Sequence, residues 1–70
     1  MASIGERGRE LCGRLASTSE GVWHPRREDR ETLMELSERL EMDLPVDAFL
    51  APSVALSFLR RALSRLNASA

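Results

Sequence analysis

Three prolines divide this chain and limit what it can fold into. They are Pro25, Pro45 and Pro52, and a proline inside a helix costs about 3 kcal/mol. Between them, apolar residues recur at steps of three and four, and no run alternates as a half-buried strand does. The sequence therefore predicts an all-α fold, a small three- to four-helix bundle.

The expected helices are short and belong to one domain, residues 1–70. They span about residues 3–16, 25–42, 46–50 and 54–66. Pro25 fits the first turn of the second helix, where its missing N–H is not needed. Ser53 is a favourable N-cap for the last helix. Three glycines weaken the first helix by about 1 kcal/mol each relative to alanine: Gly5, Gly8 and Gly13.

Length and composition restrict the class of protein. Hydrophobic residues make up 43% and charged residues 30%, a balance typical of folded domains. A domain of 70 residues has a stability of roughly 3–5 kcal/mol and a core too small for a deep catalytic cleft. No stretch approaches the ~18 apolar residues of a membrane span, and residues 1–12 lack the apolar region of a signal peptide. We therefore expect a cytoplasmic protein that is not an enzyme and does not bind membranes.

The chain has one cysteine and one histidine, Cys12 and His24, which exclude an internal disulfide and a Cys/His zinc site. Cys12 lies on the apolar stripe of the first helix, so a buried structural thiol is favoured over a nucleophile. His24 precedes Pro25 at a helix start, where capping or solvent exposure is the ordinary role. We expect no catalytic residue and no metal ligand.

The charges are segregated along the chain although their sum is only −1. Residues 1–27 hold five Arg against three Glu, residues 28–47 hold eight acidic residues against two Arg, and residues 48–70 hold three Arg and no acid. The acidic middle segment would repel nucleic-acid phosphates and attract basic protein surfaces. The single arginine cluster of the last segment is weak support for a helix-turn-helix, so we expect no nucleic-acid partner.

A series of landmarks follows without a gap from Leu33 to Leu66. It comprises Leu33, Leu36, Leu40, Asp43-Leu44-Pro45, Phe49-Leu50, Pro52-Ser53-Val54, Leu59 and Leu63. The series resembles the second half of acyl and peptidyl carrier proteins, the small helical domains of fatty acid, polyketide and nonribosomal peptide synthesis. In that family the second helix ends in an apolar-x-Pro step, a turn with Phe follows, and Pro-Thr/Ser-Val opens the last helix. Residues 4–13 also resemble, more loosely, the first helix of a bacterial acyl carrier.

Carrier proteins hold a serine at the start of the second helix, and this serine receives 4'-phosphopantetheine. The resemblance puts Arg26 at that position. Because arginine cannot accept a phosphodiester, we expect no cofactor. Ser17, Thr18 and Ser19 could serve only if the second helix began much earlier, which Pro25 opposes. The loop before that helix is also shorter than in the family.

In carrier proteins the acidic second helix is the surface that basic patches of partner enzymes recognise. The resemblance assigns this role to Glu31, Glu35 and Glu38, which share one helix face. Trp23 is a second candidate, either as a partner anchor or as a cap on the core. The expected function is a docking or regulatory partner of a synthase or its modifying enzyme. Two alternatives stay open: a homodimer that pairs helix 54–66, and a true carrier modified at an unusual serine.

Overall fold

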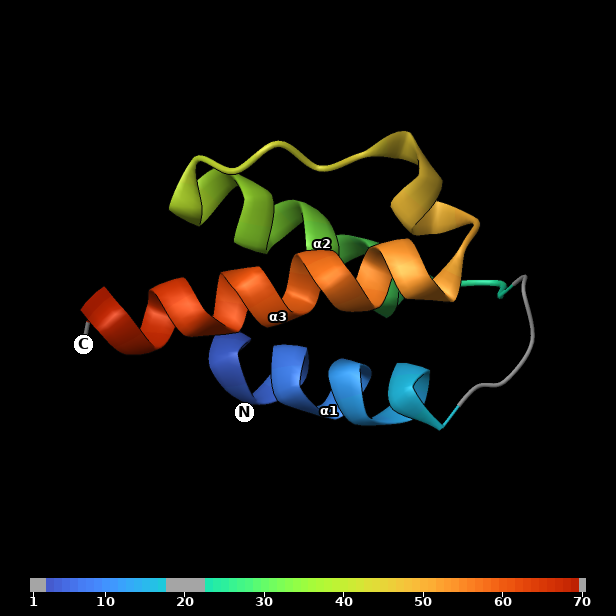
Figure 1. Cartoon of the computed structure of the whole chain (residues 1–70), viewed down its shortest axis with the longest axis horizontal. Helices are drawn as coiled ribbons and strands as arrows, with labels where there is room; N and C mark the ends of the chain where they lie inside the picture. Colours follow the sequence, from blue (N-terminus) through green and yellow to red (C-terminus); the bar gives the residue numbers. More distant parts are fainter. Residues whose placement is uncertain (1–2, 18–22, 70) are drawn as a thin grey trace.

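The computed structural model describes residues 3–17 and 23–69, and within them the chain is helical with no strand (Figure 1). Its elements are α1 (Ile4–Ala16), α2 (Arg27–Leu40), the 3-10 turn η1 (Val46–Phe49) and α3 (Pro52–Ser69). α1 runs opposite to α2 and α3, which run parallel to each other (Figure 1). The segment between α2 and α3 therefore crosses back over the bundle and includes η1. The predicted all-α bundle is confirmed.

The core lies between the three helices, and α3 packs against α1, α2 and η1. Ten apolar residues are buried there: Ile4, Leu11, Leu15, Leu33, Leu36, Ala48, Ala55, Phe58, Leu59 and Ala62. Their spacing of three, four and seven residues places them on one face of each helix. The apolar stripe of α3 thus faces the bundle's own core, and a homodimer that paired this stripe would have to open the bundle.

Gly8 is buried where α1 packs closely against side chains of α3 and α2. A Cβ added at this residue would lie 3.1 Å from Leu63 Cδ2 and 3.5 Å from Leu36 Cδ1. Gly13, one turn and a half further along α1, would meet no atom within 4 Å. The first glycine therefore permits close helix packing, whereas the second has no such role.

α2 begins at Arg27, two residues later than predicted. Arg26 is the N-cap, with extended backbone angles (φ −74°, ψ 168°), and its N–H donates to Asp29 Oδ2 at 3.1 Å. Pro25 therefore precedes the helix instead of lying in its first turn. A carboxylate three residues after the cap forms one half of a capping box; the other half is impossible, because a guanidinium has no acceptor.

α2 ends before Pro45, through a local backbone motif. Glu41 adopts the left-handed conformation (φ 52°, ψ 47°). The N–H of Met42 donates to Ser37 O at 3.0 Å, and the N–H of Glu41 to Glu38 O at 3.4 Å. These are the two bonds of a Schellman cap, which usually has glycine at the left-handed position. The helix thus ends two residues before the predicted end at 42, and this end does not depend on the proline.

α3 begins at Pro52, whereas we expected Ser53 to be its N-cap. Ala51 O accepts hydrogen bonds from the N–H groups of Val54 and Ala55, both at 3.2 Å. Pro52 is the first helical residue, the position where its missing N–H is tolerated. Ser53 lies exposed in the first turn. The one-turn helix predicted near 46–50 is present as η1.

Candidate interaction site

Asp29 holds the start of α2 against α1. Its side chain is buried, and the residue is only 4% exposed. Oδ1 accepts from Arg14 Nη2 at 2.8 Å, and Oδ2 accepts from the N–H of Arg26 at 3.1 Å. The carboxylate also lies in the first turn of α2, where the helix dipole favours negative charge. One side chain therefore caps α2 and fixes its orientation relative to α1.

A second ion pair joins the same two helices further along. Arg7 Nη2 of α1 lies 2.7 Å from Glu35 Oε1 of α2. Glu35, one of the three predicted docking glutamates, therefore has an intramolecular partner, and its side chain is 42% exposed. The segregated charges of the sequence are in part neutralised within the fold, because arginines of α1 meet acids of α2.

The other two predicted docking glutamates, Glu31 and Glu38, are exposed. Glu31 Oε1 has only a loose i,i+4 neighbour, Arg27 Nε at 3.4 Å. Glu38 forms no ion pair with any residue in 3–17 or 23–69. They lie seven residues apart, about two turns of helix, on one face. These two carboxylates are the part of the predicted face that a partner can reach without breaking an ion pair to α1.

Trp23 packs against the core and is half-buried. Its backbone N–H donates to Leu50 O at 3.2 Å, which ties the approach to α2 to the turn after η1. Its indole Nε1 is buried and forms no hydrogen bond within the described part of the chain. Of the two roles that the sequence allowed for this residue, the packing is that of a cap on the core.

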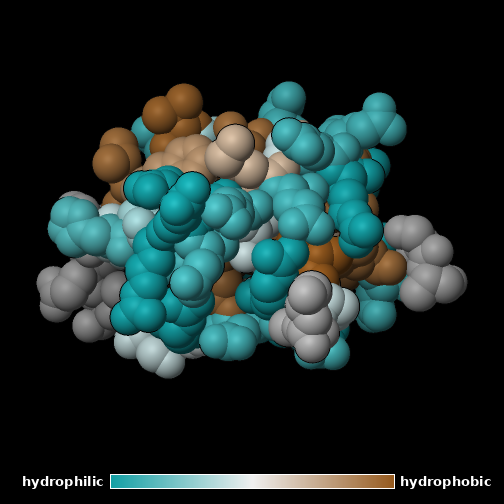
Figure 2. Space-filling view, turned by 180° about the vertical axis from the view of Figure 1, so that it is seen from behind, coloured by the Kyte–Doolittle hydropathy of each residue, from teal (hydrophilic) through white to brown (hydrophobic). Residues whose placement is uncertain are grey.

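Two exposed apolar side chains on and beside η1 could not be recognised from the sequence, although Phe49 of the same turn packs against the core as its apolar character suggests. Val46 is 77% and Leu50 58% exposed, whereas Ala48 is fully buried. A single 3-10 turn can direct only one side at the core. Hydrophobic surface is visible over this segment at the upper left of Figure 2, beside hydrophilic surface. The exposed acid Asp43 precedes this turn, and the exposed acid Asp47 lies within it.

The start of α2 does not fit a covalently attached phosphopantetheine. Arg26 occupies the N-cap and is exposed, but it has no hydroxyl to form the phosphodiester. Ser17 lies at the end of α1, where its Oγ donates to Gly13 O at 3.1 Å. Thr18 and Ser19 lie outside the described residues. No hydroxyl of the described chain stands at the α2 N-cap.

The two remaining candidate residues, Cys12 and His24, lie in different environments. Cys12 is half-buried and packs against the core, which partly meets the expectation of a buried thiol. His24 is exposed. Across residues 3–17 and 23–69, no group of three or more His, Cys, Asp or Glu residues could hold a metal ion. No helix in this part of the chain is both long enough and apolar enough to cross a membrane.

No family model, curated protein or solved structure matches this chain.

Proposed function

We propose that this chain is a carrier-protein-like docking module without a prosthetic group. It acts as a docking or regulatory partner of a synthase, or of an enzyme that modifies carriers, in fatty acid, polyketide or nonribosomal peptide biosynthesis. One observation carries the proposal: the sequence landmarks of the resemblance coincide with element ends. Arg26, at the family's serine position, is the N-cap of α2; Phe49 ends η1; and Pro52 opens α3.

The proposed docking surface consists of the exposed carboxylates of Glu31 and Glu38 on α2 together with the apolar side chains at η1. Glu31 and Glu38 retain their hydration in the free protein, so they act mainly by attracting a basic partner and setting its orientation. Such exposed charges are screened by salt. Val46 and Leu50 supply apolar area that a partner can bury. Asp29 and Glu35 instead hold the face in place through their bonds to α1.

Competition with an authentic carrier protein tests this function. A broad-specificity phosphopantetheinyl transferase is incubated with coenzyme A and the authentic carrier, and modification of that carrier is followed by intact mass. We expect added chain to slow the modification, more strongly at low salt. The double variant Glu31→Lys/Glu38→Lys should inhibit roughly tenfold less well, from two exposed charge contacts.

The matched control reverses the same number of charges on α1, as Glu6→Lys/Glu10→Lys. Both residues are exposed, so this variant should inhibit nearly as well as the unchanged chain. Glu35 is left intact because its reversal would repel Arg7 and perturb the fold. An absence of inhibition at low salt, or equal loss in both double variants, would reject a specific role for the α2 face.

A further inference from the structure

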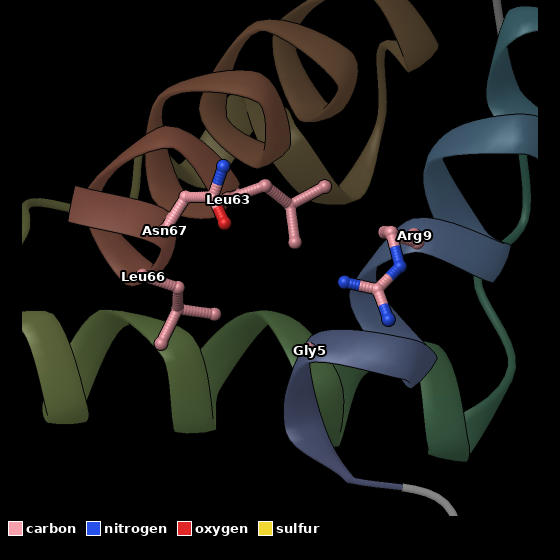
Figure 3. Close-up of a pocket in the computed structure, with 5 residues that line it drawn as sticks. All are labelled: Gly5, Arg9, Leu63, Leu66 and Asn67. Carbon is pink, nitrogen blue, oxygen red and sulfur yellow. The ribbon is translucent and has the colours of Figure 1, made fainter. Parts of the chain in front are cut away.

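A pocket of about 310 Å³ lies between the start of α1 and the end of α3, and no residue of α2 is among those that line it (Figure 3). Gly5 and Arg9 line it from α1, and Leu63, Leu66 and Asn67 line it from α3. Pockets that bind small molecules start at about 300 Å³ and combine apolar walls with a few polar groups. This pocket has the size of a site for one small molecule.

The shape of the pocket depends on two glycines of α1. At Gly5 an added Cβ would have only the guanidinium of Arg9, at 3.7 Å, and Ser3 Oγ, at 3.9 Å, within 4 Å. The absence of a side chain there leaves the space open. One turn later, Gly8 lets Leu63 approach α1 closely, so α1 and α3 pack tightly beside the pocket. The half-buried Leu63 and Leu66 form the apolar wall.

Arg9 is the charged group of this pocket, and its guanidinium is available to a ligand. The other two arginines of α1, Arg7 and Arg14, form ion pairs with α2. Arg9 forms no hydrogen bond or ion pair with any residue in 3–17 or 23–69. Its guanidinium extends into the space between the two helices, with Leu63 and Asn67 across from it (Figure 3). A fork of N–H donors thus faces an apolar wall across the pocket.

We propose that this pocket binds a small carboxylate with a short unbranched apolar chain. The guanidinium of Arg9 binds the carboxylate through two parallel N–H···O bonds, the geometry for which arginine is suited. Leu63 and Leu66 contact the chain and remove its apolar surface from water. The amide of Asn67 lies at the rim and can donate to the same carboxylate. This site is formed by α1 and α3 and is independent of the proposed docking function.

Both halves of the ligand are required for binding. A carboxylate without a chain gains only a charge contact at an exposed arginine, which is weak in water. A chain without a charge leaves the guanidinium facing an apolar ligand. Hexanoate is therefore a suitable probe, with acetate and hexanol as the charge-only and chain-only controls.

The test is a titration of the ¹⁵N-labelled full chain with each probe, followed through the amide resonances of Gly5 and Leu66. We expect saturable shifts with hexanoate and at least tenfold weaker binding of acetate, because acetate lacks most of the apolar chain. Hexanol and the variant Arg9→Ala each remove the charge contact at an exposed arginine, so each should bind about fivefold more weakly than hexanoate binds the unchanged chain. The control Arg61→Ala, an exposed arginine of α3 that does not line the pocket, should bind hexanoate as the unchanged chain does.

A second variant, Gly5→Leu, fills the pocket without changing any charge. It should abolish hexanoate binding while the spectrum retains the dispersion of the folded chain, because an added Cβ would lie at ordinary contact distance from Arg9 Nη1, 3.7 Å, and Ser3 Oγ, 3.9 Å. Three results would overturn the proposal: no saturable shift with hexanoate, equal affinity for acetate, or equal loss in Arg9→Ala and Arg61→Ala.

Discussion

Removal of the Asp29 carboxylate is the perturbation whose effect on stability follows most directly from the structure. Asp29→Ala deletes the cap bond to the N–H of Arg26 and the bond from Arg14. Loss of a helix N-terminal cap costs about 0.5–2 kcal/mol. The bond from Arg14 adds about 1 kcal/mol at most, because the arginine side chain is 50% exposed and solvent screens the charge. We therefore expect the free energy of unfolding to fall by about 2 kcal/mol.

That loss is large for so small a domain, whose total stability we place at roughly 3–5 kcal/mol. Urea denaturation followed by circular dichroism measures the loss in the free energy of unfolding. In thermal denaturation the same loss should lower Tm by roughly 10 °C. Asp29→Asn keeps an acceptor for the cap but loses the charge, so its loss should be smaller. Arg14→Ala leaves the cap bond in place and should cost less than half as much as Asp29→Ala.

Glu28→Ala is the matched control, since Glu28 is an exposed acid in the same turn of α2. Its effect should stay within about 0.5 kcal/mol, as is usual for surface substitutions. The reasoning is refuted if Asp29→Ala also stays within that range. It is refuted as well if Arg14→Ala costs as much as Asp29→Ala, because the cap would then contribute nothing.

Three further substitutions test the packing and the caps through the same denaturation assay. Gly13→Ala should raise the free energy of unfolding by about 0.5–1 kcal/mol, because the added methyl meets no atom within 4 Å and alanine favours the helix. Gly8→Ala should instead lower the free energy of unfolding by up to about 1 kcal/mol, because its methyl would lie 3.1 Å from Leu63 Cδ2. Equal stabilisation by Gly13→Ala and Gly8→Ala would contradict the close packing at Gly8. Glu41→Gly should stabilise by about 0.5–1 kcal/mol by relieving a left-handed conformation, whereas a loss of stability would argue against the observed cap.

Much of the fold follows from local periodicity in the sequence. The spacing of Phe58, Leu59 and Ala62 predicts the buried face of α3, and all three are fully buried. The ends of α2 could not be predicted in the same way. Pro25 is compatible both with the first helical turn and with the position before the N-cap. Which of the two it occupies depends on Asp29, because this side chain caps α2 at Arg26. Asp29 is itself held by Arg14, which belongs to the distant helix α1.

In the candidate site, too, the features that the sequence did not predict depend on contacts between residues far apart in the chain. Glu31, Glu35 and Glu38 were correctly expected on one helix, α2. The pairing of Glu35 with Arg7 joins residues 28 positions apart, so the sequence alone did not separate Glu35 from its two exposed neighbours. The inward side of η1 likewise depends on where α3 lies against it, and this left the exposure of Val46 and Leu50 unforeseen.

A graft at the start of α2 tests the central proposal, that Arg26 occupies the position at which a carrier protein has its modified serine. Pro25→Asp, Arg26→Ser and Arg27→Leu together introduce the family's Asp-Ser-Leu step, and serine is itself a favourable N-cap. Graft and unchanged chain are incubated with coenzyme A and a broad-specificity phosphopantetheinyl transferase, beside an authentic carrier, and their intact masses are measured. We predict that the graft gains the mass of one phosphopantetheine group and the unchanged chain gains none. A folded graft that stays unmodified, or an unchanged chain that is modified, would contradict the claim.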